Sequence, residues 1–246
     1  MTTSGSPKET GQSEQDPVSR SPDEQDPVRH DQLTAAHRRL LERTAHLPVD
    51  GPRWGSRQFF LTARLGLADE EDFKRRWVGH YADTIRAAAR EAGIPESVLA
   101  GIAYREAGGK PEWMNTAVGW VRRRGLSSRH PDKTSYGPME VQVRRAAEAL
   151  GYDPADLTPA QRGRIISSLK NPHQGIIIAA YHLRDLKKET SFAHKEPHQM
   201  TLEEGRELAA RYNGGPYWRG RQAQSYARQY ERDLPKAIAA INHTSA

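Results

Sequence analysis

The sequence predicts a mainly α-helical fold, and three observations support this prediction. Apolar residues recur every three or four positions from residue 31 onward, which is the spacing of a buried helix face. Sustained alternation of apolar and polar residues, the pattern of a strand, does not occur. Candidate N-caps, glycines and prolines divide the chain into segments of helical length. A mean hydropathy of −0.85 and the lack of a long apolar run exclude a membrane-spanning protein.

The residue content limits both chemistry and partners. Cysteine is absent, which excludes disulfide scaffolds, thiolate metal sites and a cysteine nucleophile, so catalysis must use carboxylates, histidines, hydroxyls or amides. Lys and Arg outnumber Asp and Glu by 37 to 31, although residues 1–50 hold six basic and nine acidic side chains. The rest of the chain is therefore basic, which favours a polyanionic partner: nucleic acid, an anionic membrane or a cell wall.

Three regions are predicted along the chain. Residues 1–30 are rich in Ser, Pro, Gln, Asp and Glu and poor in large apolar side chains, so we expect a disordered acidic leader. The leader contains a short repeat, Glu14–Arg20 and Glu24–Arg29, which is either drift within a linker or a recognition tag for a secretion apparatus. Residues 31–69 are predicted to form an N-terminal helical extension, and residues 70–246 the main domain.

The predicted helices start in the extension. Asp31 is expected to cap a helix that ends before Pro48, and Gly55–Gly66 is expected to form a short helix or docking segment. The main domain is predicted to begin with one helix that starts at Asp69 or Glu70 and is closed by Gly93. Its apolar stripe consists of Phe73, Trp77, Tyr81, Ile85 and Ala88.

The next predicted helix, which begins at Pro95, carries a candidate catalytic group. Glu106 lies seven residues after Leu99 and four after Ile102, so it shares the apolar face of its helix, in the last turn. Burial and the negative end of the helix dipole both raise the pKa of a carboxyl group, which can then act as a general acid. The same spacing also allows Glu106 to turn toward solvent or to pair with Arg105 or another arginine.

The second half of the chain is predicted to be helical after a break. Residues 110–138 interleave Gly, Ser, Pro and basic residues and predict loops with a small hairpin, followed by a helix over 139–150. Capping-box patterns at Thr158 and Asn171 open two further helices, the second so apolar that it is predicted to be the central buried helix. Thr201 with Glu204 forms a third capping pattern, which opens a helix predicted to end at 212–215. The last predicted helix begins near Arg221 and ends before Pro235.

Four short motifs occur in order along this helical region. They are Tyr104–Gly109, Ser135–Gln142, Asn171 at the start of an apolar helix, and Arg211–Gly215. Together they resemble the soluble lytic transglycosylase and goose-type lysozyme family, whose pattern runs E-S-G, G-L-M-Q, an Asn-opened helix and A-Y-N-G-G. The resemblance implies a lysozyme-like α lobe with a substrate groove, in which residues 70–246 form the catalytic domain.

The resemblance also implies roles for the matching residues. Glu106 would be the acid that protonates the glycosidic oxygen between N-acetylmuramic acid and N-acetylglucosamine in peptidoglycan. A tyrosine hydroxyl within reach of this acid could orient it or stabilise its protonated form. On the residues alone, Tyr212 could instead be core packing and Asn213 a helix C-cap. The implied substrate-binding residues are Ser135, Met139, Glu140, Tyr212 and Asn213.

Two routes of cleavage remain open. Hydrolysis needs a second carboxylate, for which Glu140 and Asp132 are the candidates and Glu112 a weaker one. A lytic transglycosylase needs only Glu106, because the 6-hydroxyl of muramic acid closes on its own anomeric carbon. We expect the transglycosylase, with a hydrolytic muramidase as the alternative. Glu140 stands where the family usually has glutamine, and a carboxylate cannot donate as an amide does.

Other classes of function compete with this hypothesis. One is a lysozyme-like module that binds glycan without cutting it, and another is a basic nucleic-acid-binding protein, motivated by clusters such as Arg122–Arg124 and Arg144–Arg145. Nucleic acid is the less favoured partner because no zinc-finger, RRM or basic-zipper signature is present. No cofactor or metal site is expected, since Pro197 separates His194 from His198 in a polar segment.

Delivery to a cell wall would need its own route. No positively charged segment and apolar stretch follow Met1, so no cleavable secretory signal is predicted. We expect synthesis in the cytoplasm and delivery to the wall by injection as an antibacterial effector, by non-classical export, or by lysis as for a phage-type lysin. The leader would then serve delivery, through a secretion or contractile injection apparatus.

Overall fold

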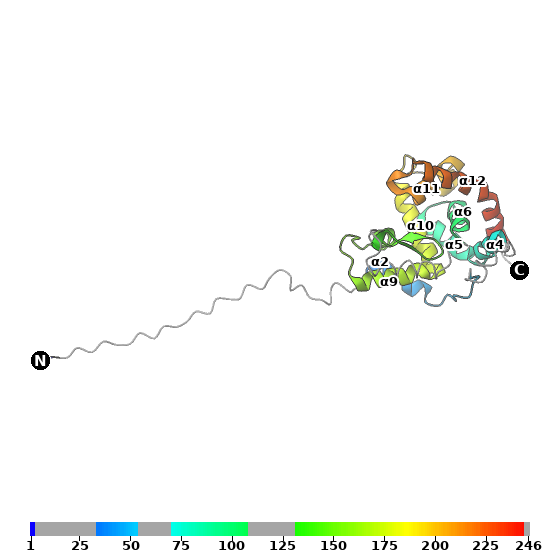
Figure 1. Cartoon of the computed structure of the whole chain (residues 1–246). Coiled ribbons are helices and arrows are strands. Elements are labelled where there is room, and N and C mark those ends of the chain that lie inside the picture. Colours follow the sequence, from blue (N-terminus) through cyan, green and yellow to red (C-terminus); the bar gives the residue numbers. More distant parts are fainter. Residues whose placement is uncertain (3–32, 54–69, 108–130, 244–246) are drawn as a thin grey trace, which may run out of the picture. The chain divides into compact units, whose positions relative to one another are not determined.

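The chain forms a mainly helical body, which confirms the predicted fold class (Figure 1). Contacts divide the chain into two units, Met1–Gln32 and Leu33–Ala246. The second unit holds the helices and a two-stranded sheet described below. The computed structural model describes residues 1–2, 33–53, 70–107 and 131–243.

Several predicted features lie outside the described residues. These include nearly all of the acidic leader, the expected segment at Gly55–Gly66, and most of the loop region predicted at 110–138. Within the described ranges, no helix is both long and apolar enough to cross a membrane.

The elements of the second unit begin with helices, continue through a short hairpin, and return to helices. The strands β1 (Ser135–Tyr136) and β2 (Val141–Gln142) pair antiparallel, with Ser135 opposite Gln142 and Tyr136 opposite Val141. The order is α2 (Ala35–Thr44), α4 (Glu70–His80), α5 (Ala82–Ala92), α6 (Glu96–Glu106), the 3₁₀ turn η1 (Pro131–Lys133), β1 (Ser135–Tyr136), β2 (Val141–Gln142), α8 (Val143–Ala149), α9 (Pro159–Lys170), α10 (Pro172–Lys188), η2 (Pro197–Gln199), α11 (Leu202–Gly214), η3 (Gly215–Tyr217) and α12 (Arg221–Asn242).

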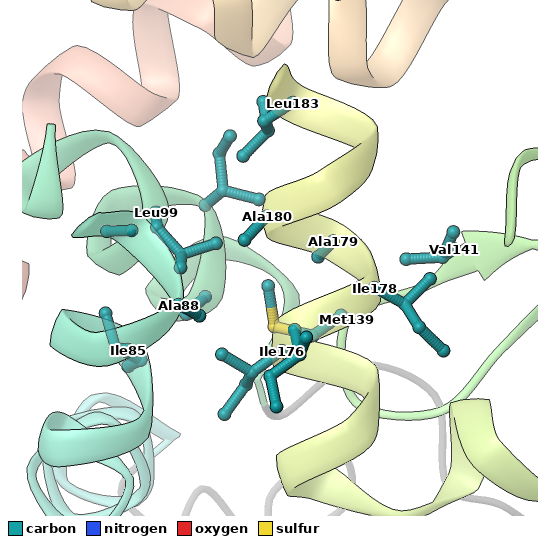
Figure 2. Close-up of a cluster of buried hydrophobic side chains, with 14 of the residues drawn as sticks. Ile85, Ala88, Leu99, Met139, Val141, Ile176, Ile178, Ala179, Ala180 and Leu183 are labelled. Carbon is teal, nitrogen blue, oxygen red and sulfur yellow. The ribbon is translucent and has the colours of Figure 1, made fainter. Parts of the chain in front are cut away.

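The helix α10 is the central helix, as its apolar composition predicts. It contacts α2, α5, α6, α8, α9, α11 and β2. Figure 2 shows Ile176, Ile178 and Leu183 of α10 among side chains from α5, α6 and the hairpin, all of them buried. Each fully buried aliphatic side chain stabilises the fold by about 1.5–3 kcal/mol. This shared core therefore fixes α6 and the hairpin, which carry the predicted site, relative to each other.

Two of the three predicted capping boxes form in full, at Thr158 and at Thr201. At Asn171 only half of the box is present. The Asn171 side chain accepts from the backbone N–H of Gln174 at 3.2 Å, but the Gln174 amide donates to Thr44 Oγ1 of α2 at 3.0 Å. A tertiary partner has therefore replaced the local one.

The helix predicted from Glu70 to Gly93 is wrong in one respect, because it is two helices. The backbone of Tyr81, at φ −96° and ψ 15°, separates α4 from α5. Its buried ring lies 4.7 Å from the Trp77 ring and 5.0 Å from the His173 ring. Since α4 packs against α6 and α12 while α5 packs against α10 and α6, the break lets each helix follow its own neighbours.

The helix α12 continues through Pro235, where the sequence predicts its end. A proline inside a helix costs about 3 kcal/mol. Beyond it, Ala237, Ala240 and Ile241 are buried, and α12 packs against α4. Burial of this last stretch offsets the cost of the proline, so the helix goes on.

Two predicted helix starts are also corrected. Thr34 caps α2 by accepting from the backbone N–H of His37 at 3.0 Å, and Asp31 lies outside the described residues. The helix expected from Met139 begins at Val143, because residues 139–142 complete the hairpin turn and β2. The small hairpin is therefore present, but it extends beyond the predicted range.

Candidate active site

Glu106 ends α6 with its side chain half-buried. Its Oε1 accepts a hydrogen bond from the Tyr226 hydroxyl of α12 at 2.6 Å, while Oε2 has no hydrogen-bond partner among the described residues. Burial raises the pKa of Glu106 to about 7; the charge of Glu140 adds to this rise, whereas the Tyr226 hydrogen bond and the charges of Arg105 and Lys74 oppose it. Near neutral pH this carboxyl group can both donate and accept a proton.

Arg105 does not form the ion pair with Glu106 that the sequence left open. Its guanidinium donates to Asp233 Oδ2 at 3.0 Å and to Gln229 Oε1 at 2.6 Å, both on α12. The same guanidinium lies 5.6 Å from the centre of the Tyr226 ring. Arg105 therefore ties the end of α6 to α12 and holds the tyrosine that contacts Glu106.

The tyrosine bonded to Glu106 is Tyr226, whereas the family resemblance implies Tyr212 as the tyrosine at the site. The Tyr212 hydroxyl donates to the Met139 carbonyl of the hairpin at 2.7 Å. Burial, and then the charges of Glu106 and Glu140, raise the pKa of Tyr212 well above its usual range, so it lies near both carboxyl groups. The sequence holds one indication of this role: Tyr226 lies on the apolar stripe of α12, and a tyrosine hydroxyl on such a face needs a hydrogen-bond partner.

The hairpin turn fixes the position of Glu140. Gly137 has φ +73°, and a Cβ on it would come within 1.7 Å of the Leu169 carbonyl oxygen, so no other residue fits there. The Met139 side chain is fully buried in the core (Figure 2), which leaves its carbonyl as the group that faces Tyr212. Glu140 itself adopts a left-handed backbone at φ +49°. Such a backbone is strained in a residue other than glycine and is a common feature of functional sites.

The structure separates the two candidates for a second carboxylate. Asp132 is buried in η1, and both of its oxygens are bound by the Arg162 guanidinium, one of them at 3.0 Å. Both oxygens of Asp132 are therefore engaged in an ion pair with this arginine. Glu140, in contrast, acts electrostatically on Glu106. The weaker candidate, Glu112, lies outside the described residues.

The remaining predicted site residues have less direct placements. Ser135 is half-buried in β1. Asn213 is exposed in the last turn of α11, and the C-cap is Gly215 at φ 51°, so Asn213 does not cap the helix. Behind Tyr212, the His182 ring of α10 lies at 5.6 Å, and burial, with the charge of Arg145, lowers the pKa of His182 to about 4. This neutral histidine was not predicted, although a histidine on the most apolar helix is a signal for one.

The described residues contain no group of three His, Asp or Glu side chains that could hold a metal ion. Comparison of the chain with protein-family models, with curated proteins and with solved structures finds no match.

Proposed function

We propose that this chain is a peptidoglycan-cleaving enzyme that cuts the β-1,4 bond between N-acetylmuramic acid and N-acetylglucosamine. The main support is Glu106: a half-buried carboxyl group with a pKa raised to about 7, held through one oxygen by Tyr226. Strongly shifted carboxyl groups are typical of acid–base catalysis. The substrate class comes from the resemblance of the four motifs to the transglycosylase and goose-type lysozyme family.

The proposed reaction uses Glu106 twice. Its protonated carboxyl group donates to the glycosidic oxygen, the bond to the anomeric carbon breaks, and positive charge develops on the muramic acid ring. The resulting carboxylate then accepts the proton of the 6-hydroxyl as that oxygen bonds to the same anomeric carbon. The products are a 1,6-anhydro end and a free 4-hydroxyl, and Glu106 returns to its starting state. Tyr226 would keep the carboxyl group in place through both steps.

A hydrolytic muramidase is the second candidate, and Glu140 is the observation that favours it. This carboxyl group acts on Glu106 electrostatically and is held by a strained turn. In this route Glu140 would remove a proton from water as the water attacks the anomeric carbon.

The products distinguish these routes. The purified full chain would be incubated with isolated peptidoglycan, and the released fragments analysed by mass spectrometry with the Glu106→Gln variant as control. Anhydro ends are expected, and reducing ends, heavier by one water, would indicate hydrolysis. Protein that sediments with the wall but releases no fragment would be a non-catalytic glycan-binding module. Salt-sensitive retention on DNA without release of fragments would indicate the nucleic-acid-binding class instead.

A further inference from the structure

A second cluster of aromatic and basic side chains follows the helix that carries Tyr212. Gly215–Trp218, which we name the aromatic turn, contains the most exposed aromatic side chain of the described residues, Tyr217, at 82%. Next to it, the Trp218 ring lies 4.5 Å from the Arg211 guanidinium and 4.2 Å from that of Arg219. An exposed aromatic ring does not help the fold, and together with arginines it is typical of a binding surface.

The backbone of the aromatic turn is held in place. The Gly220 N–H donates to the Tyr217 carbonyl at 2.8 Å, and the Gln224 amide donates to the Trp218 carbonyl at 2.9 Å. At the start of the turn, Gly214 packs so closely that an added Cβ would lie 2.6 Å from the Ala223 Cβ of α12. The Tyr217 ring is therefore exposed on a rigid support, which lowers the entropy lost when a ligand binds.

Three guanidinium groups of the described residues lie close to the turn, one of which, that of Arg145, is paired with Glu148 at 2.8 Å. Arg219 is exposed and forms no ion pair among the described residues, whereas Arg211 is paired with Glu207 at 2.7 Å. Arg145 also approaches, since a Cβ on Gly215 would lie 3.5 Å from its Nη2. A ligand with both an apolar face and a carboxylate matches this combination of ring and guanidinium.

The aromatic turn also lies close to the candidate active site along the chain. Tyr217 follows Tyr212 by five positions, so their Cα atoms are at most about 18 Å apart. A polymer held at Glu106 could therefore reach the turn within a few sugar units. A nucleic-acid strand, with its chain of phosphates, is a less suitable ligand between Tyr212 and the aromatic turn, because the carboxyl groups of Glu106 and Glu140 lie near Tyr212.

We propose that the aromatic turn is a second binding site, for a stretch of the glycan strand away from the bond that is cut. The apolar C–H face of a sugar ring stacks on Tyr217, and Arg219 takes a carboxylate of the lactyl-peptide substituent. The identity of the polymer rests on the proposed function, whereas the existence of the site rests on the turn itself.

The test measures binding apart from cleavage. Full chains carrying Glu106→Gln are mixed with insoluble peptidoglycan, and the bound fraction is determined by sedimentation. Adding Tyr217→Ala should weaken binding about tenfold, whereas Leu202→Ala, at an exposed apolar residue at the other end of α11, should not change it. Adding Arg219→Gln should weaken binding to native peptidoglycan but not to peptidoglycan whose carboxylates have been amidated.

Each outcome bears on one proposal. Unchanged binding of the Tyr217→Ala protein overturns the second site, even if Glu106→Gln abolishes cleavage. A Tyr217→Ala effect on a single-stranded oligonucleotide, with binding to peptidoglycan unchanged, also overturns it in favour of nucleic acid. If the parent chain cuts no peptidoglycan while Tyr217→Ala still weakens binding to it, the proposed function fails and the binding site stands.

Discussion

Two titratable groups of this protein, the half-buried Glu106 and the fully buried His37, each contact a tyrosine hydroxyl, yet their pKa values move in opposite directions. Glu106, at 2.6 Å from the Tyr226 hydroxyl, has its pKa raised by burial to about 7. His37, whose Nδ1 lies 2.7 Å from the Tyr152 hydroxyl, has its pKa lowered to about 4 by burial and by the charge of Arg164. Burial disfavours the charged form, which is the ionised form of a carboxyl group and the protonated form of an imidazole.

The two groups also differ in how completely they are bonded. Both ring nitrogens of His37 have partners, because Nε2 lies 2.8 Å from Ser168 Oγ, and the residue is fully buried between α2 and α9. Glu106 has one bonded oxygen among the described residues. A satisfied group that stays neutral at physiological pH stabilises the fold, whereas a partly satisfied group that titrates near 7 is suited to chemistry.

The largest expected effect comes from Glu106→Gln, which keeps the shape of the side chain but removes its proton. Release of fragments from peptidoglycan should fall by at least the 10²–10⁴-fold typical of general acid–base catalysis.

The free energy of unfolding of the Glu106→Gln protein should not fall. The folded-state pKa of Glu106 is raised from 4.5 to about 7, so the cost of ionising it is absent below pH 4.5 and complete above pH 7.

The same variant should therefore be more stable than the parent at pH 8, by up to about 3 kcal/mol, with no difference at pH 4. Urea unfolding at both pH values checks this. Retention of more than a few per cent of activity would refute the role of Glu106.

His37→Ala should lower the stability of the fold and leave the activity unchanged, the reverse of Glu106→Gln. Removing the imidazole leaves Tyr152 and Ser168 without their buried partner, which should lower the free energy of unfolding by about 2–4 kcal/mol. The turnover number should stay the same. Ser168→Ala is the milder control, at about 1 kcal/mol. Urea unfolding and fragment release measure the two quantities, and a loss of turnover in folded His37→Ala protein would contradict the comparison.

The buried histidines also set an acid limit on stability. The folded-state pKa values of His37 and His182 lie near 4, below the usual 6.5. The stability that the two neutral histidines contribute to the folded state is therefore complete above pH 6.5 and is lost as the pH falls toward 4. In His37→Ala protein, this acid destabilisation should be smaller than in the parent.

Tyr226→Phe should have an intermediate effect, because it removes one hydrogen bond and keeps the ring. Turnover should fall about tenfold through poorer orientation of the carboxyl group. The hydrogen bond of Tyr226 lowers the pKa of Glu106, so its loss should raise that pKa further. In a pH–rate profile, the decline in activity that the parent shows around pH 7 should move to higher pH. An unchanged profile would mean that Tyr226 has no influence on the acid.

Among the three substitutions at the candidate active site, Glu140→Gln should have the smallest effect on rate, and its effect on the pH dependence should be opposite to that of Tyr226→Phe. The charge of Glu140 raises the pKa of Glu106, so removing it should move the decline in activity to lower pH. If Glu140 is not the base, turnover at pH 6 should change by less than about threefold and the anhydro ends should remain. A loss of 10²-fold or more, with reducing ends in the parent, would show that Glu140 activates water.

Much of the fold follows from local patterns in the sequence. The apolar spacing of α6 and α10 and the capping boxes at Thr158 and Thr201 depend on residues within a few positions of each other, and they appear as predicted. The placement of Glu106 on an apolar helix face, which made it the candidate acid, is a property of the same kind. Periodicity reports these features because helix geometry is repeated from turn to turn.

The tertiary structure decided every feature that depends on a distant partner. It broke the helix at Tyr81, extended α12 past Pro235, turned Gln174 toward Thr44, and gave Glu106 its hydrogen bond from Tyr226 rather than from Tyr212. In each case the competing contact joins segments far apart in the chain. The sequence by itself thus determined that most of these segments are helical and that Glu106 shares the apolar face of its helix. Only the packing of the helices decided how far this carboxyl group is exposed, which groups contact it and hence its pKa, because these depend on groups from α4, α6, the hairpin and α12.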